Sequence, residues 1–286
     1  MQISSYYKSK GHDVGFDIVN PDKVYISCIY RKNALKALIE SWSYDCDVEI
    51  GGTGVNYKQL PIEIQKIKPD YDLYPSEHSL GFTTKGCIRN CPWCIVRKKE
   101  GYFKRHQHVK EFYDTKFDTV ELLDNNILAD KKWFFNNTDF LVNNKLKLIE
   151  NGMDIRLIDV DIIQRLKELK CDTFHFAFDS MTDEKSVIDG IKLLKLNGIN
   201  IRGKVFFYVL IGFNTTFEED LYRIKLLRKL NTNAYAMPYN QIKTPLISDL
   251  IRYCNRKWIY WSCEPEEYIY GKYKMRANKR KVGDYF

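Results

Sequence analysis

The sequence lacks any run of about 18 apolar residues, so we expect no transmembrane helix. The first residues, from Met1 to Tyr7, lack the apolar core of a secretory signal peptide. Internal repeats and low-complexity segments are also missing. Eight cysteines without a secretory signal are typical of a reducing compartment. We therefore expect a cytoplasmic protein.

The chain has 286 residues, of which 44% are hydrophobic and 14% aromatic, so it suits one large domain or two smaller ones. The formal net charge is +8. Cations gather in two runs, from Arg97 to Lys110 and from Lys272 to Lys281. Such runs bind nucleic acid or other polyanions in some proteins. A solvated surface is the more common role, and we favour it.

Three cysteines, Cys87, Cys91 and Cys94, stand at C-x3-C-x2-C spacing. They follow a strand-like run from Leu80 to Thr84, and the next cysteine along the chain is Cys171. Thiolates are the usual ligands of iron–sulfur clusters. A four-iron cluster held by only three thiolates keeps one iron open for another ligand. The spacing therefore indicates such a cluster.

Two other interpretations of the cysteines stay open. A structural zinc ion also takes cysteine, and His106 or His108 would supply its fourth ligand. A disulfide would leave one of the three cysteines over. The spacing favours the cluster over zinc.

The motif, with Trp93 directly before its last cysteine, resembles the signature of the radical S-adenosylmethionine enzymes. The resemblance implies a 4Fe–4S cluster on the three cysteines and S-adenosylmethionine on the open iron, with Trp93 beside the cofactor. It further implies reductive cleavage to methionine and a 5′-deoxyadenosyl radical, which abstracts hydrogen from an unidentified substrate. The cofactors would carry this chemistry while the protein positions them.

The resemblance also implies an external electron donor of the flavodoxin or ferredoxin kind. The basic run from Arg97 to Lys110 follows the cysteine loop, so we expect an anionic substrate or carrier. Catalytic side chains cannot be assigned from the sequence. Two alternative functions are a zinc-dependent nucleic-acid-binding module and a non-catalytic binding subunit related to the radical enzymes.

Strand-like and helical segments alternate beyond residue 76, which predicts an α/β fold with a parallel sheet and crossover helices. The resemblance implies a partial (β/α)6 barrel over residues 76–245, with its chemistry at the carboxyl ends of the strands. Predicted helices include 162–169, 184–196 and 217–230, the last with a capping box from Thr216 to Glu219. The predicted strands are 80–84, 119–123, 153–157, 173–178, 201–211 and 233–237.

Residues 1–75 are predicted to form a small α/β domain, and residues 246–286 a helix from 246 to 261 followed by a basic tail. The small domain has predicted strands at 24–30 and 47–50, a helix at 34–40, and a glycine-rich turn at 51–54. It resembles a truncated, Rossmann-like cobalamin-binding domain.

Cobalamin itself is not expected. A common cobalamin loop is D-x-H-x-x-G, and its nearest match here is the segment around His12, with Lys10 in place of the aspartate. The partner that orients a metal-bound histidine contributes strongly to binding. We therefore interpret the N-terminal domain as a remnant that braces the barrel or shapes substrate access.

Asp124 and Asn126 follow the predicted second strand, where the resemblance implies contacts to the amino group of S-adenosylmethionine. An Asx turn that ends the strand is an equal alternative. Arg156, on the predicted strand 153–157, is a candidate for the carboxylate of S-adenosylmethionine. Its alternative is a structural ion pair with an acid such as Asp154, Asp159 or Asp161.

Asp179 ends the predicted fourth strand, where it would bind ribose hydroxyls or cap the next helix. Gly212 ends the predicted fifth strand, and the resemblance implies that adenine approaches the backbone there. The five cysteines outside the motif have no close pairing in sequence, so we expect them to be free and buried.

Overall fold

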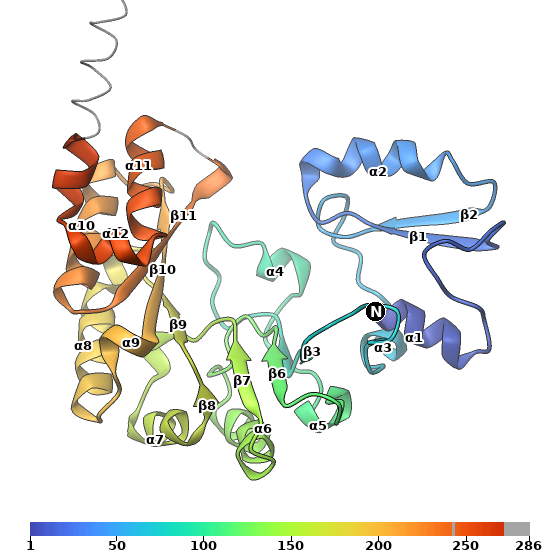
Figure 1. The fold of residues 1–286 in the computed structure, drawn as a ribbon, viewed down its shortest axis with the longest axis horizontal. Coiled ribbons are helices and arrows are strands. Elements are labelled where there is room, and N and C mark those ends of the chain that lie inside the picture. The colour runs from blue at the N-terminus through green and yellow to red at the C-terminus, as the bar shows by residue number, and fades with distance from the viewer. Residues whose placement is uncertain (242–243, 272–286) are drawn as a thin grey trace, which may run out of the picture. The chain divides into compact units, whose positions relative to one another are not determined.

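The computed structural model describes residues 1–241 and 244–271 (Figure 1). The chain divides into two compact units, Met1–Asn125 and Asn126–Phe286. Each unit mixes α-helices with mostly parallel β-strands, as the sequence predicts. In the described ranges no helix is both long enough and apolar enough to cross a membrane.

The predicted division into residues 1–75, 76–245 and 246–286 remains a prediction. The basic run from Lys272 to Lys281 lies outside the described residues.

The first unit begins with helix α1 (Gln2–Ser9), which was not predicted. Strands β1 (Lys23–Ser27) and β2 (Asp47–Gly51) pair in parallel, and helix α2 (Ala34–Ser41) connects them and packs on both. A 3-10 turn, η1 (Arg31–Asn33), leads into α2. The two strands and the helix predicted here are confirmed.

The glycine-rich turn after β2 wraps around the backbone of Cys28. Gly52 has a φ of +103°, and a Cβ there would lie 2.4 Å from the Cys28 carbonyl oxygen. The amide of Gly54 donates to that same oxygen at 2.9 Å. Only glycine permits this approach.

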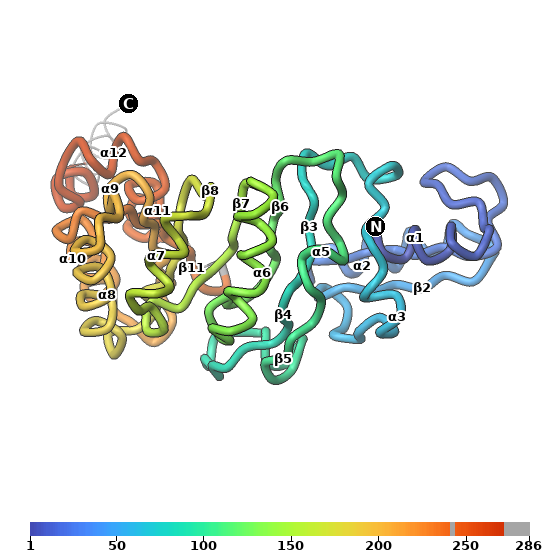
Figure 2. Tube along the Cα trace, turned by 90° about the horizontal axis from the view of Figure 1, so that it is seen from below, coloured from blue at the N-terminus to red at the C-terminus, as the bar shows by residue number. Residues whose placement is uncertain are grey.

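The rest of the first unit surrounds the cysteine motif. Strands β3 (Ser79–Gly81) and β6 (Thr119–Leu122) pair in parallel, and helix α5 (Val109–Phe112) packs on β3. The short strands β4 (Thr84–Lys85) and β5 (Lys104–Arg105) pair antiparallel. Figure 2 labels them on neighbouring stretches of the chain. Two short helices also belong to this region, α3 (Ile62–Gln65) and α4 (Val96–Lys99).

The second unit contains a parallel sheet in the order β11–β10–β9. Its strands are β9 (Phe174–Ala177), β10 (Val205–Ile211) and β11 (Asn233–Pro238). Figures 1 and 2 both show helices α8 (Glu184–Leu196) and α10 (Phe217–Lys229) on the same side of this sheet. The alternating β10 residues Val205, Phe207, Val209 and Ile211 are fully buried.

Helix α10 begins with the predicted capping box, in which Thr216 and Glu219 cap each other. Strand β7 (Lys147–Glu150) pairs in parallel with the two-residue strand β8 (Lys170–Cys171). The remaining helices of the unit are α6 (Lys131–Asn143), α7 (Val160–Glu168), α9 (Ile201–Lys204), α11 (Pro245–Cys254) and α12 (Lys257–Ser262).

The predicted third strand, 153–157, is wrong. Residues Ile155–Leu157 form the 3-10 turn η2, because the Asp154 side chain accepts the amide of Arg156 and caps the turn. The real strand is β7, which ends three residues before Met153.

Two other segments differ from the prediction. The strand predicted to begin at residue 201 begins at Val205, because Asn200 caps the helical turn α9. The helix predicted over 246–261 is interrupted at Asn255. The Asn255 amide group donates to the Ala236 carbonyl at 3.1 Å and accepts the Ala236 amide at 2.8 Å. Asn255 thereby caps the open edge of β11, which explains the interruption.

Candidate functional site

The cysteine motif lies on the loop that β4 and β5 close at its base. Within the loop Cys87 forms an isolated bridge with Tyr102, and the amide of Cys94 donates to the Cys91 carbonyl at 3.0 Å. All three cysteines are partly exposed. The amide of Arg89 donates to Cys87 Sγ at 3.3 Å. The loop therefore carries three partly exposed cysteines on one short segment.

Three thiols on one loop suit an iron–sulfur cluster, or zinc if a fourth ligand joins them. In the described ranges no three His, Cys, Asp or Glu side chains converge closely enough to hold one metal ion. Tetrahedral zinc at about 2.3 Å from each sulfur would require sulfurs roughly 4 Å apart. A cluster accepts wider spacing, because each thiolate binds a different iron. None of the eight cysteines forms a disulfide.

Both histidines proposed as a fourth zinc ligand are engaged elsewhere. His106 is 9% exposed, and its Nε2–H donates to the Gln65 carbonyl at 3.3 Å. His108 Nδ1 accepts the amide of Lys110 at 3.1 Å and caps α5. Each hydrogen bond uses one of the two ring nitrogens, so the zinc interpretation stays open.

Glu100 fixes the start of the cysteine loop, a role that sequence reasoning missed. Its side chain is 4% exposed, and its Oε2 accepts the Gly86 amide at 3.0 Å and the Asn125 Nδ2 at 2.7 Å. Gly86 has a φ of +72°, and a Cβ there would lie 2.2 Å from the Tyr102 carbonyl oxygen. The backbone directly before Cys87 is therefore tightly constrained.

Asp124 holds Thr83 and Thr84, which precede Gly86 in the chain. Its two oxygens accept the amides of Thr83 and Thr84, at 2.9 and 2.6 Å, and both threonine hydroxyls. Burial raises the pKa of Asp124, whereas these four hydrogen bonds oppose the shift. Both oxygens therefore hold the segment that leads into the cysteine loop, and the contact of Asp124 with S-adenosylmethionine remains a prediction.

Asn126 shows the Asx turn that the sequence offered as its alternative. It is 5% exposed, and its Oδ1 accepts the amides of Leu128 and Asp154, each at 3.2 Å. The side chain therefore joins two loops of the second unit. Its contact with S-adenosylmethionine remains a prediction.

Arg156 lies on η2, where it is paired with acids. Its Nε lies 2.7 Å from Asp154 Oδ1, and its Nη1 lies 2.9 Å from Asp183 Oδ1. Of the three acids offered as alternative structural partners, Asp154 pairs with Arg156, whereas Asp159 and Asp161 pair with Lys131. Its role in cofactor binding also remains a prediction.

Asp179 and Gly212 are brought together by a buried ion pair on α10. Arg223 is fully buried and donates to the Phe178 carbonyl at 2.6 Å and to the Leu210 carbonyl at 2.7 Å. It also pairs with Asp220, whose Oδ2 accepts the Gly212 amide at 3.0 Å.

Asp179 completes this network. Its Oδ1 accepts the Leu210 amide at 2.9 Å, and burial raises its pKa. The Asp220–Arg223 pair therefore anchors the ends of β9 and β10. Sequence reasoning missed both residues, although charges at i and i+3 on an otherwise apolar helix face were a visible signal.

Glu150, which ends β7, was missed because its strand was missed. Its side chain is fully buried, and its Oε1 accepts the His175 amide at 2.6 Å and the His175 Nδ1 at 2.9 Å. Burial raises the pKa of Glu150. The His175 ring stacks on Tyr208 with 5.5 Å between ring centroids. The pair ties β9 to the end of β7.

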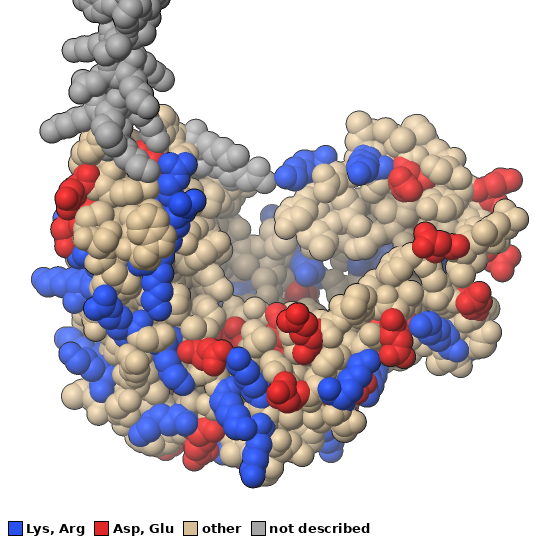
Figure 3. Space-filling model, viewed as in Figure 1, with Lys and Arg blue, Asp and Glu red and all other residues tan. Residues whose placement is uncertain are grey.

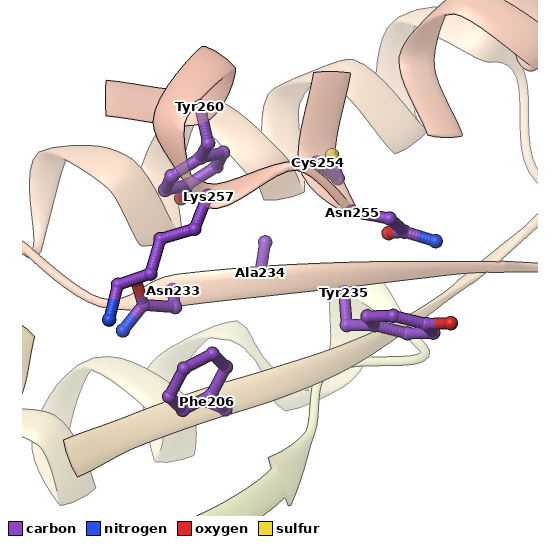
Figure 4. Close-up of a pocket in the computed structure, with 8 residues that line it drawn as sticks. All are labelled: Phe206, Asn233, Ala234, Tyr235, Cys254, Asn255, Lys257 and Tyr260. Atoms are coloured by element: carbon purple, nitrogen blue, oxygen red, sulfur yellow. The ribbon is translucent and has the colours of Figure 1, made fainter. Parts of the chain in front are cut away.

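A small cavity lies beside the edge strand β11. Its volume is about 60 Å³, room for a few waters and far below the several hundred Å³ of a cofactor site. Figure 4 shows Phe206 on one side of β11 and Lys257 and Tyr260 on the other. The cavity is therefore not a candidate for S-adenosylmethionine.

No protein-family model and no curated protein matches the chain. One similar solved structure is the radical S-adenosylmethionine methyltransferase TsrM from Kitasatospora setae, with cobalamin and a [4Fe–4S] cluster bound. It shares 13% identity and a TM-score of 0.47 over 56% of this chain and 36% of that chain. Another is the Escherichia coli coproporphyrinogen III oxidase HemN, a radical SAM enzyme. It shares 14% identity and a TM-score of 0.42 over 63% of this chain and 48% of that chain. The chain thus spans less than half the length of either structure.

Replacing Asp124 with Ala should destabilise the first unit and reduce its iron content. The Thr83 and Thr84 amides would lose their acceptor, at about 1–3 kcal/mol for each buried donor left unpaired. Iron per protein after anaerobic reconstitution and the urea midpoint both measure the effect. Asp118→Ala, at an exposed site on the same segment, is the matched control. Unchanged iron and stability in Asp124→Ala would contradict the positioning role.

Replacing Arg223 with Met should cost about 3–5 kcal/mol of unfolding free energy, because Asp220 would remain buried without its cation. Lys225→Met is the control, since Lys225 pairs with Glu266 at the surface of the same helix and should cost at most about 1 kcal/mol. Urea denaturation followed by circular dichroism compares the two. Equal losses would show that the buried pair contributes no more than the surface pair.

Lowering the pH should reduce the free energy of unfolding through His106, which directly follows β5 at the base of the cysteine loop. Burial first, and the charge of Lys85 second, lower its pKa from 6.5 to about 4. Between pH 4 and pH 6.5 His106 is protonated in the unfolded chain and neutral in the folded chain. The contribution of neutral His106 to the free energy of unfolding is therefore complete above pH 6.5. It should fall by roughly 2–3 kcal/mol as the pH drops to 4. Stability curves for His106→Gln should be flatter over this window, while the exposed control His12→Gln should follow the unaltered protein.

Proposed function

We propose that the protein is a radical S-adenosylmethionine enzyme with one 4Fe–4S cluster on Cys87, Cys91 and Cys94. The observation that carries the proposal is the cysteine motif on a loop held by Glu100 and Asp124, with all three cysteines partly exposed. When bound, these groups supply reductive cleavage of S-adenosylmethionine and a radical that abstracts hydrogen from the substrate. An external flavodoxin- or ferredoxin-type protein would provide the electron.

The residues of the chain orient the cysteines in this proposal. Gly86 turns the backbone into the loop, and Glu100 accepts its amide. Arg97 donates to the Cys87 carbonyl at 3.1 Å, and its guanidinium lies 3.6 Å from the centre of the Tyr102 ring. These contacts bind both ends of the loop to each other, which limits the movement of the first cysteine.

The substrate is proposed to be anionic. Part of the basic run is used internally, since Arg97 contacts Cys87 and Lys99 pairs with Glu100. Lys98 is exposed and forms no ion pair with another described residue, so it remains for an external anion. We also propose that residues 76–245 form a partial (β/α)6 barrel. The same proposal holds that the protein does not require cobalamin.

Replacing any one motif cysteine with Ala should abolish cluster retention and the formation of 5′-deoxyadenosine, because no fourth cysteine lies on the loop. Cys91→Ala is compared with Cys46→Ala, a cysteine outside the motif. Anaerobic reconstitution, iron analysis and chromatography of the S-adenosylmethionine reaction with dithionite give the readouts. A colourless zinc protein, or Cys91→Ala with full iron and full cleavage, would refute the proposal. A brown protein that never cleaves S-adenosylmethionine would indicate the binding-subunit alternative.

A further inference from the structure

The sheet β11–β10–β9 has one face that is less covered than the other. The alternate β10 residues from Val205 to Ile211 are fully buried, whereas Phe206 and Tyr208 point to the opposite face and are only partly buried. On that face His175 pairs across the strands with Phe206, and Tyr235 with Tyr208. Figure 3 shows charged side chains over the helices of this unit, whereas these four strand residues are all ring-bearing. We refer to the four as the open sheet face.

His175 is held in one orientation on the open sheet face. Its Nδ1 lies 2.9 Å from Glu150 Oε1, and its ring centre lies 5.5 Å from that of Tyr208 and 5.7 Å from that of Phe206. The same Glu150 oxygen accepts the His175 amide at 2.6 Å. Because this oxygen is an acceptor, the tautomer that fits donates a proton from Nδ1 and keeps a lone pair on Nε2.

The second ring nitrogen of His175 is available to a ligand. Within residues 1–241 and 244–271, Nε2 has no hydrogen-bond partner, and it is not among the buried side-chain atoms that lack one. The His175 side chain is 23% exposed, whereas that of Glu150 is fully buried. A proton donor that reaches the open sheet face therefore meets Nε2, with the carboxylate on the other side of the ring.

The buried carboxylate favours a positive charge on that ring. Glu150 Oε2 is buried without a hydrogen-bond partner among the described residues, and a buried carboxylate without a cation is costly. Two other ionisable side chains near it stay neutral. Burial first, and Glu150 second, raise the pKa of Cys171 to about 12 and raise that of Tyr208 as well. A proton taken up by His175 places the compensating charge beside the carboxylate.

We propose that Glu150 and His175 form a proton-accepting pair that binds a phenol on the open sheet face. The ligand ring lies against Tyr208 and Tyr235, whose ring centres are 5.9 Å apart, and its O–H group donates to His175 Nε2. The proton passes from the phenol oxygen to Nε2, which leaves a phenolate beside an imidazolium, with Glu150 as the counter-ion. All these residues belong to the second unit, so the proposal does not depend on the proposed radical chemistry.

The test titrates 4-nitrophenol into the full chain, because the anion of this probe absorbs at a longer wavelength than its neutral form. The pH is fixed where the free probe is mostly neutral. Binding with proton transfer should raise the anion absorbance to a plateau at one probe per chain. 4-Nitroanisole, which has the same ring without the O–H group, should bind at least about tenfold more weakly. No rise in anion absorbance, or equal binding of both compounds, would overturn the proposal.

Variants of the pair locate the proton acceptor. His175→Gln should abolish the rise in anion absorbance. Glu150→Gln keeps an acceptor for Nδ1–H but removes the charge, so it should raise the dissociation constant of 4-nitrophenol about tenfold. His78→Gln is the matched control and should change nothing, since His78 also pairs with a glutamate, Glu121, at 2.7 Å and is 25% exposed. A rise that survives in His175→Gln, or is lost equally in His78→Gln, would overturn the proposal.

An exposed variant guards against misfolding. Tyr235 is 45% exposed, so Tyr235→Ala should leave the circular dichroism and the urea midpoint unchanged. It should raise the dissociation constant of 4-nitrophenol about fivefold, because the ligand ring loses an aromatic contact. Unchanged affinity in this variant would show that the probe binds elsewhere and would also overturn the proposal.

Discussion

The order of the cysteine loop depends on one buried carboxylate. Asp124 is 1% exposed and accepts the amides and hydroxyls of Thr83 and Thr84, the residues that lead into the loop. Desolvation of the carboxylate is costly, and four hydrogen bonds offset that cost. Since the same oxygens bind both backbone and side chains, Thr83 and Thr84 have little freedom to move. The cysteine loop therefore starts from a fixed backbone.

Buried acids hold strand ends elsewhere in the protein too. Asp220, with Arg223, fixes the carbonyls of Phe178 and Leu210, and Glu150 fixes the amide of His175. Where parallel strands end, backbone groups lose their ladder partners and require others. A carboxylate is a strong acceptor for such amides. The protein therefore uses side chains to complete hydrogen bonding at the points where a parallel fold would place its chemistry.

Much of the secondary structure was predictable because its signals are local. The run from Val205 to Ile211 has the composition of a buried strand, and Thr216 with Glu219 marks the start of α10. Strand β7 was missed because four residues carry too little periodicity, and the alternation at 153–157 was mistaken for it. Helix α6 was missed because its many asparagines and aromatics are weak helix formers, so its helix depends on packing.

The sequence by itself determined which residues carry sulfur and that they share one loop, since both follow from spacing along the chain. Only the tertiary structure revealed the contacts of the charged candidates. Asp124 meets Thr83 across 41 residues and Arg156 meets Asp183 across 27, so no local pattern reveals either contact. A carboxylate after a strand suits a cofactor, a helix cap or a loop anchor equally well. Its partners, which folding brings from distant segments, determine which of these it becomes.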